Sequence, residues 1–426
     1  MTSPTQLPAL VAAGAARQAA VDMPPLDAWL FRHQSGGAIC MTAAVLAWFE
    51  GPPPTLYELR ARVRQRWAVH ERLRLTAVET PAWPQWVPGP QWDPAHHVAA
   101  HDTSPAALET LAAQLLAHPL GPARPPWQLH LLPAESGFAL FLLSHHALLD
   151  GVSLVTLLRS LLDAPAAVPR PRSPGGAAPP VPSRLDRVRA VLDVLPRARP
   201  LPFHGPVDAR RAVSWSRVPV SELSTARDAL ASGRASANAV FLAAAAGALR
   251  TAGLTGRVSR LPGVCAMVPV DVRDGSGPVV LGNHYATVRV PLPAGGGPRQ
   301  RLASVDGFTR RAALKQRAQA QARLVASRPQ RHGRFDALLG RYADSPLFSS
   351  LLCTSAASYA GQLTLGPARF TALAGLPPLS PGHPLAMSML LHDETAVVTV
   401  VTDHGHRHLA ARLPGLIREE IDALRG

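Results

Sequence analysis

The N-terminal part of the chain mixes the hydrophobic periods of strands and helices. Residues 137–146 (GFALFLLSHH) form a continuous apolar run, which is typical of a strand buried on both faces, and residues 38–50 also predict a strand. Residues 104–120 predict a helix with Ser104 as its N-cap. Helical spacing also appears after residue 54 and again in the run VSLVTLLRSLLDA that begins at residue 152.

The C-terminal part alternates in the same way. Strands are predicted for RAVSWSRVPV, GVCAMVPVDVR and a closing hairpin that turns at residues 392–395. Residues 236–253 form an Ala-rich helix with almost no polar residues, which predicts burial. One Arg-rich helix is predicted over residues 305–325. Strands and helices alternate without a regular βαβ repeat, so we expect an α/β class of mixed α+β type.

A Pro/Ala/Gly-rich stretch interrupts these periods at residues 163–184. Proline at this density is incompatible with a helix or a central strand, so the stretch is predicted to be a surface linker. It divides the chain into an N-terminal domain (1–162) and a C-terminal domain (185–426), and a basic amphipathic helix is expected at residues 183–195.

Composition limits the setting in which the protein works. The chain has 426 residues, 47% of them hydrophobic, so more than one hydrophobic core is expected. No apolar run approaches the roughly 18 residues of a membrane span, and the N-terminus lacks the pattern of a signal peptide. The cysteines are three and far apart, which fits neither a disulfide framework nor a zinc site. We therefore expect a cytoplasmic protein.

The net charge of +15 is carried almost entirely by arginine, since Lys315 is the single lysine. Such charge attracts nucleic acid, an anionic membrane surface or a phosphate-bearing small molecule. No helix-turn-helix, zinc-finger or RNP signature accompanies it, so no nucleic-acid partner is expected. The basic segment between residues 310 and 334 is interpreted either as a site for the phosphates of a ligand or a lipid surface, or as a solvated helix face.

The candidate chemistry lies in the run HHALLDG, at the end of the buried strand. Adjacent residues of a strand point to opposite faces, so His145 and His146 cannot both face one reacting atom. One is expected to act and the other to support it, because neutral imidazole takes a proton readily near neutral pH. Asp150 can fix the loop by pairing with an arginine, and Gly151 permits a tight turn. The alternative is a pair of structural histidines.

HHxxxDG resembles the signature of the CoA-dependent acyltransferases with a chloramphenicol-acetyltransferase-like fold. Other segments are similar to one branch, the bacterial wax ester synthase/diacylglycerol acyltransferase family. They are PLGPARPPW (119–127) for PLxxxxPLW, NAVFLA (238–243) for NDVVLA, PVDVR (269–273) for PVxxR and LGN (281–283), with PLDAWLFRHQ (25–34) before them and Asp403 after.

The resemblance implies two similar domains with a tunnel at their junction, entered by acyl-CoA and by an alcohol or diacylglycerol. His146 would take the hydroxyl proton during direct attack on the thioester. Asp150 would be structural, with Arg273 as its expected partner. The resemblance implies no cofactor beyond acyl-CoA as co-substrate, no metal, and peripheral association with a membrane or lipid droplets.

Three segments depart from the family pattern. Ala239 replaces the Asp of the ND motif, Pro125-Pro126-Trp127 replaces PLW, and residues 355–358 (SAAS) stand where an NVPGP element is expected. These motifs are expected to shape the tunnel, with Asn238 and Trp127 as substrate-binding candidates. The reaction type is therefore predicted more sharply than the acceptor. A specialised-metabolite hydroxyl or amine, with a carrier-protein donor, is the alternative, and a catalytically inactive scaffold is a third hypothesis that the intact histidine motif disfavours.

Three further features have competing interpretations. Histidines 404, 406 and 408 would share one face of a strand and bind a metal, but a solvated turn is favoured. Trp83 and Trp86 belong either to a lipid-facing loop or to a packed irregular segment, and packing is favoured. Asn238 either caps its helix or faces the tunnel.

Overall fold

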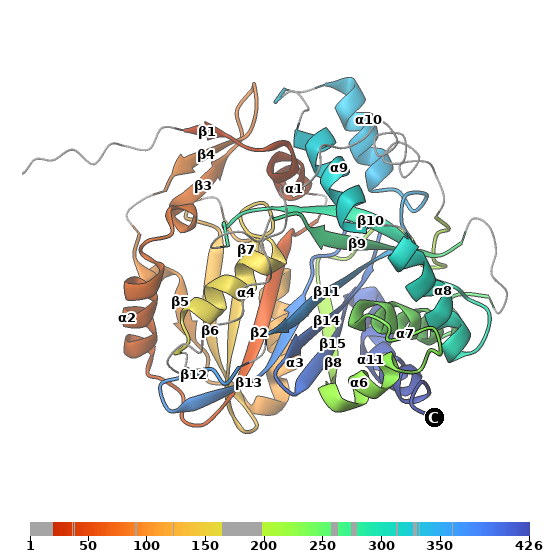
Figure 1. Cartoon of the computed structure of the whole chain (residues 1–426). Coiled ribbons are helices and arrows are strands. Elements are labelled where there is room, and N and C mark those ends of the chain that lie inside the picture. The colour runs from red at the N-terminus through yellow and green to blue at the C-terminus, as the bar shows by residue number, and fades with distance from the viewer. Residues whose placement is uncertain are drawn as a thin grey trace, which may run out of the picture.

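The computed structural model describes residues 20–426, apart from residues 36, 38, 90–91, 122, 164–197, 257–262, 274–278, 312–313, 327–329, 332 and 360. Its described part contains two six-stranded sheets and a small three-stranded sheet, with helices packed around them (Figure 1). Residues 164–184 of the predicted linker and the predicted helix at 183–195 lie outside the described residues.

The first sheet carries the strand that ends at the histidines. Its central strand β7 runs antiparallel to both β2 and β6, and residues 138–145 of β7 are all buried, as its apolar run predicted. In spatial order the strands are β12 (Thr364–Leu365), β13 (Ala368–Leu376), β2 (Thr42–Glu50), β7 (Gly137–His145), β6 (Trp127–Ala134) and β5 (Val98–Ala100).

The second sheet belongs to the C-terminal part of the chain. It mixes parallel and antiparallel pairs, and β14 and β15 form the predicted closing hairpin, with His392 opposite Thr395. In spatial order the strands are β10 (Tyr285–Pro291), β9 (Cys265–Asp271), β11 (Leu351–Tyr359), β14 (Leu385–His392), β15 (Thr395–Asp403) and β8 (Arg211–Pro219).

Strand exchange links the two parts of the chain. β13 follows the second sheet's β11 in sequence, yet it pairs antiparallel with β2, from Arg369 opposite Glu50 to Leu376 opposite Ala44. The two sheets therefore do not divide where the predicted domains 1–162 and 185–426 do. Long-range pairing of this kind depends on backbone hydrogen bonds between distant segments, and it leaves no period in the local sequence.

The residues that the structure describes form two hydrophobic cores, in line with the prediction of more than one from the length of the chain. β14 contributes to both, because successive side chains of a strand point to opposite faces: Met387 and Met389 lie in the second core, Ala386 and Leu390 in the first. The helices are α1 (Pro25–Ser35), α2 (Leu56–Trp67), α3 (Leu108–Ala117), α4 (Gly151–Ser160), α6 (Val220–Arg227), α7 (Ala237–Thr251), α8 (Pro298–Arg311), α9 (Leu314–Ala326), α10 (Arg334–Ala343) and α11 (Arg407–Asp422).

The structure corrects two helix predictions. The helix expected over residues 104–120 begins as a 3₁₀ turn, and the Ser104 side chain makes no capping hydrogen bond, because α3 itself starts only at Leu108. The single Arg-rich helix is two helices, α8 and α9. The buried Ala-rich helix is confirmed as α7, in which every residue from Ala239 to Leu249 is buried.

The structure agrees with the favoured interpretation of two further segments, a packed segment at Trp83 and Trp86 and a turn at residues 404–408. Trp83 and Trp86 are buried, and the Trp83 indole donates to the carbonyl of Met23 at 2.8 Å, so packing is confirmed. Trp86 lies on β4 (Gln85–Pro88), between β1 (Val21–Asp22) and β3 (Leu75–Val78). Residues 404–408 are not on a strand: they form a 3₁₀ turn and the start of α11, because the Asp403 side chain caps the turn. No described helix has the length and apolar character of a membrane span.

Candidate active site

The histidine motif occupies the turn between β7 and α4. β7 ends at His145, and α4 begins at Gly151, with Asp150 as its N-cap. The Asp150 Oδ1 atom accepts a hydrogen bond from the Ser153 backbone N–H at 2.8 Å, which satisfies one of the free N–H groups at the start of the helix. The strand, loop and helix predicted for this motif are confirmed.

His145 supports the loop from within. The His145 ring is buried, and its Nδ1 accepts the backbone N–H of Ala147 at 3.0 Å, while the backbone N–H of His145 donates to the Pro126 carbonyl at 2.9 Å. Burial, with a smaller effect of His146, lowers the pKa of His145 to about 3. The ring is therefore neutral at physiological pH, and its geometry fits the supporting role.

His146 is the partly exposed histidine of the motif, whereas His145 is buried. Burial lowers its pKa, while its own backbone carbonyl and the charge of Asp150 act in the opposite direction. The Tyr285 ring lies 5.5 Å from the His146 ring, and burial raises the pKa of Tyr285, so this phenol stays protonated. A neutral imidazole in this position has the protonation state that a general base requires.

Asp150 is paired with Arg273, the partner predicted from the sequence. The Arg273 Nη2 atom lies 3.0 Å from Asp150 Oδ2, and both side chains are at most one-tenth exposed. The same Oδ2 accepts the backbone N–H of His284 at 3.0 Å. Arg273 also donates to Ser153 Oγ at 3.0 Å. These bonds join the first turn of α4 to the β9–β10 segment, so Asp150 has the contacts of a structural residue.

We expect Arg273→Ala to lower the free energy of unfolding by about 2 kcal/mol, because Asp150 would stay buried without its cation but would keep two backbone donors. The free energy of unfolding of Arg273→Lys should lie between those of wild type and Arg273→Ala, because an ammonium restores the positive charge but not the planar guanidinium with its several donors. Chemical denaturation of the three proteins measures the order. If Arg273→Ala had the same free energy of unfolding as wild type, the Asp150–Arg273 pair would not contribute to stability.

Three side chains from three different segments, to which the sequence assigned no role, meet at the histidine loop. Asn283, in the LGN element, donates to the His146 carbonyl at 2.8 Å, and Arg72 donates to the Leu148 carbonyl at 3.0 Å. Asp27 binds both side chains. The PLD and LGN segments stood out in the family resemblance, and that was the available signal. Their meeting at the histidine loop is visible only in three dimensions.

Asn238 does not cap its helix. Ser236 is the N-cap of α7, and its Oγ accepts the Ala239 N–H at 3.0 Å. The Asn238 Oδ1 atom instead accepts a hydrogen bond from Ser355 Oγ at 2.8 Å. The capping alternative is therefore wrong, and two departures from the family pattern, near Ala239 and at Ser355, meet in space. The role of Asn238 in substrate binding stays a prediction.

Strand pairing opens near this contact. β9 and β11 are paired only at Leu351–Ala266 and Leu352–Met267, although both strands continue further in the same direction. Ser355 lies on the part of β11 beyond the last pair. A tunnel through this region remains a prediction of the family resemblance.

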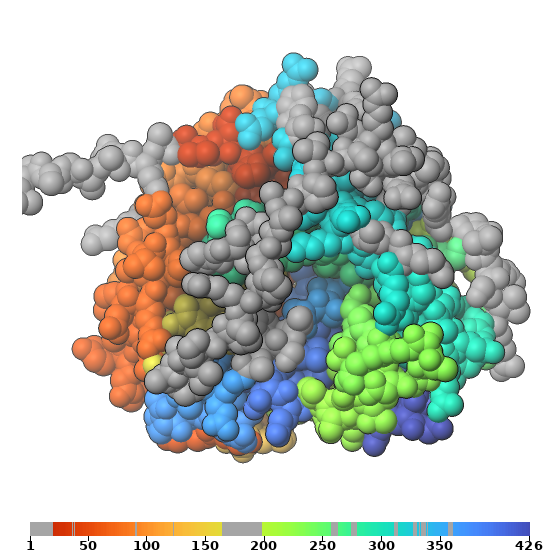
Figure 2. All heavy atoms as spheres, in the orientation of Figure 1, coloured from red at the N-terminus to blue at the C-terminus, as the bar shows by residue number. Residues whose placement is uncertain are grey.

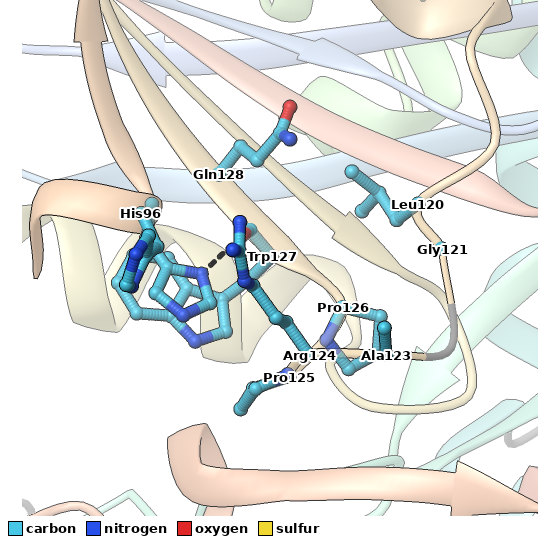
Figure 3. Close-up of a pocket in the computed structure, with 10 residues that line it drawn as sticks. His96, Leu120, Gly121, Ala123, Arg124, Pro125, Pro126, Trp127 and Gln128 are labelled. Atoms are coloured by element: carbon cyan, nitrogen blue, oxygen red, sulfur yellow. Dashed lines mark hydrogen bonds between the residues drawn. The ribbon is translucent and has the colours of Figure 1, made fainter. Parts of the chain in front are cut away.

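Trp127 has the contacts of a core residue. Its ring is 1% exposed, stacks on His97 at 4.2 Å, and donates from Nε1 to the Leu73 carbonyl at 2.9 Å. A small cavity of about 220 Å³ lies beside it, lined by residues 120–121 and 123–128 with His96 and His97 (Figure 3). The indole N–H of Trp127 is already used in its bond to the Leu73 carbonyl. The role of Trp127 in substrate binding stays a prediction.

Among the residues that the structure describes, no group of three or more His, Cys, Asp or Glu side chains is placed to bind a metal ion. His406 instead bonds Asp403 through Nδ1, at 2.5 Å.

Solved structures define the class of this fold. A wax ester synthase/diacylglycerol acyltransferase from Marinobacter aquaeolei VT8 matches with a TM-score of 0.67 and 16% identity, over 95% of this chain and 98% of its own. A trichothecene 15-O-acetyltransferase from Fusarium sporotrichioides matches with a TM-score of 0.69 and 12% identity over 100% of both chains. A condensation domain of the calcium-dependent antibiotic synthetase matches at 0.66 and 16%, over 96% of each. The fold is that of the two-domain chloramphenicol-acetyltransferase-like proteins, as predicted.

The sequence comparison narrows the class to one family. The model of the wax ester synthase/diacylglycerol acyltransferase catalytic domain matches residues 23–275, and the chain belongs to this family. A Mycobacterium tuberculosis protein named for diacylglycerol O-acyltransferase activity is 31% identical over an alignment of 268 positions that covers 51% of this chain and 52% of the relative. The chain thus spans about half the length of this curated relative.

Proposed function

We propose that the protein is an O-acyltransferase that moves an acyl group from acyl-CoA to a hydroxyl acceptor, a long-chain alcohol or a diacylglycerol. The observation that carries this proposal is the state of His146. It is a neutral, partly exposed imidazole at the end of β7, in a loop held by the Asp150–Arg273 pair. Membership in the family supports the choice of donor and acceptor.

The proposed reaction needs one base and no covalent enzyme intermediate. The His146 imidazole takes the proton of the acceptor hydroxyl as the oxygen attacks the thioester carbonyl. The tetrahedral intermediate collapses, the carbon–sulfur bond breaks, and the departing CoA thiolate takes the proton back from the imidazolium. The products are an ester and free CoA, and the base is regenerated. No cofactor takes part.

A second candidate keeps the base and changes the substrates. The acceptor would be a hydroxyl or amine of a specialised metabolite, and the donor an acyl group on a carrier protein. The contact between Asn238 and Ser355 favours it, because Ser355 departs from the family pattern and Asn238 directly precedes Ala239, which also departs from it. Altered side chains at a substrate-facing position change which acceptor fits more readily than they change the reaction.

Thiol release separates the two candidates. Acyl-CoAs of several chain lengths are incubated with long-chain alcohols, a diacylglycerol, polar alcohols and amines, and free CoA is measured. Release that depends on the lipid acceptors supports the first proposal. Release with polar acceptors only supports the second. No acceptor-dependent release from acyl-CoA, or from acylated carrier protein, contradicts both.

We also propose that the protein is cytoplasmic and associates peripherally with an anionic membrane or lipid-droplet surface. Leu324 on α9 and Leu338 on α10 are 48% and 63% exposed, and exposed Arg323 and Arg341 lie on the same two helices. Figure 2 shows atoms of these helices at the top of one face. Apolar side chains among cations suit an anionic interface.

Sedimentation with vesicles tests this surface. We expect binding to phosphatidylglycerol vesicles that falls with added salt, and a loss of about 10-fold in Leu324→Gln/Leu338→Gln. Tyr57→Gln is the matched control, because Tyr57 is 81% exposed on α2. Equal binding of all three proteins would exclude α9 and α10 as the contact surface.

A further inference from the structure

The loop after β7 presents three successive backbone carbonyls to two side chains. Asn283 Nδ2 donates to the carbonyls of His146 at 2.8 Å and Ala147 at 2.9 Å. Arg72 donates from Nη2 to the carbonyl of Ala147 at 3.1 Å and from Nε to that of Leu148 at 3.0 Å. The backbone that carries the His146 ring is therefore held from outside the motif.

A buried carboxylate joins these two side chains. Asp27, on α1, is 2% exposed. Its Oδ1 accepts from Asn283 Nδ2 at 2.9 Å, and its Oδ2 accepts from Arg72 Nη2 at 2.5 Å and from Trp86 Nε1 at 3.1 Å. The Arg72 guanidinium also lies over the Trp86 ring, 4.9 Å from its centroid. A buried polar network in which these donors are matched by acceptors is rigid.

The amide orientation of Asn283 is determined by its neighbours. Its Nδ2 atom lies within hydrogen-bond distance of three oxygens, two from carbonyls and one from Asp27. A flipped amide would place Oδ1 against the same three acceptors, which is unfavourable. Asn283 thus donates to the His146 carbonyl, and this same carbonyl raises the pKa of the His146 ring.

We propose that Asp27 is a positioning residue for the base His146. It holds Arg72 and Asn283 against the loop carbonyls, and its negative charge favours the imidazolium that forms when His146 takes the acceptor proton. This inference rests on the proposed function. It assigns to the N-terminal helix α1 a part in the reaction that the histidine motif alone does not reveal.

Electrostatics around His146 agrees with this role. The charge of Asp27 opposes the lowering of the His146 pKa by burial, and Asp150 acts in the same direction. The other titratable or charged groups around the loop are His145, Tyr285, His284, Arg72 and Arg273. Removing the charge of Asp27 should therefore lower the His146 pKa, so that the base stays neutral to lower pH.

The kinetic test uses Asp27→Asn, which keeps the size of the side chain and removes its charge. We expect kcat to fall about 10- to 100-fold with KM for acyl-CoA within about 3-fold, because misplacing a base costs rate more than binding. The acid limb of the kcat/KM profile should move to lower pH. Arg72→Gln should lower kcat similarly, whereas Arg32→Gln, at a surface ion pair with Glu79, should keep wild-type kcat.

A second measurement does not depend on activity. The His146 ring proton is titrated by NMR in wild type and Asp27→Asn, and its signal is assigned by its loss in His146→Ala. A lower pKa in Asp27→Asn supports the proposal even if no acceptor has been found. An unchanged pKa with wild-type kcat overturns it. A kcat reduced only in proportion to the folded fraction, with an unmoved acid limb, also overturns it, because a purely structural role predicts that result.

Discussion

Replacing His146 by alanine should reduce acceptor-dependent CoA release by about 10²- to 10⁴-fold, the usual contribution of a positioned general base. His146 is the partly exposed histidine of the motif, whereas the His145 ring is engaged by the Ala147 backbone N–H. Only transition-state stabilisation is removed, so KM for acyl-CoA should change little. Steady-state thiol release with the best acceptor measures the effect.

The pH dependence of kcat/KM tests the same role of His146 as the base. A base is active when neutral, so activity falls as pH drops through its pKa. Since burial lowers the His146 pKa from the model-peptide value of 6.5, the acid limb of kcat/KM should lie below pH 6.5. His118→Ala is the matched control, because this ring is exposed at the C-terminal end of α3 and bonds the Gln114 carbonyl of that helix, away from the histidine motif. If His146→Ala kept wild-type turnover, the proposed mechanism would be wrong.

Replacing Gly247 by alanine should destabilise the fold by about 1–3 kcal/mol, although alanine favours helices. Gly247 lies in α7, against α11, and a Cβ at this position would fall on the carboxylate of Glu420. Glu420 pairs there with Arg301, which is 2% exposed. Displacing the carboxylate weakens its pair with this buried guanidinium, although Arg301 keeps its bond to the Gly296 carbonyl, so the cost is part of the penalty for breaking a buried ion pair.

The matched control is Gly415→Ala in α11, where a Cβ would meet no atom within 4 Å. It should stabilise the protein by up to about 1 kcal/mol, the ordinary gain of alanine over glycine in a helix. Opposite signs for the two substitutions, in denaturant unfolding, are the expected result. Equal signs would mean that Glu420 moves aside without cost.

Local sequence predicted those parts of the site that lie on one continuous segment. A buried strand, a loop and a helix follow one another from residue 137 to residue 160, and each has its own hydrophobic period. The same run predicted that one histidine acts and the other supports it, and the family resemblance assigned the role of base to His146. The Arg273 partner came from the family resemblance, and the structure places it 3.0 Å from Asp150.

Other predictions were limited by competition between signals. Ser104 has the right residue type for an N-cap, but Pro105 starts a 3₁₀ turn, and the α-helix begins later. Asn238 also has a capping side chain, yet Ser236 takes that role two residues earlier. Propensity identifies residues able to cap a helix; the backbone path decides which one does.

By itself, the sequence determined the buried strand β7, the helices α4 and α7, the closing hairpin and the run that carries His146, because these depend on patterns and spacings within short segments. Only the tertiary structure decided that β13 joins the first sheet, and that Asp27, Arg72 and Asn283 meet at the histidine loop. Asp27 and Asn283 are separated by 256 positions, and the residues paired between β2 and β13 lie further apart still. Hydrogen bonds over such separations are formed by packing of the whole chain, and no local pattern encodes them.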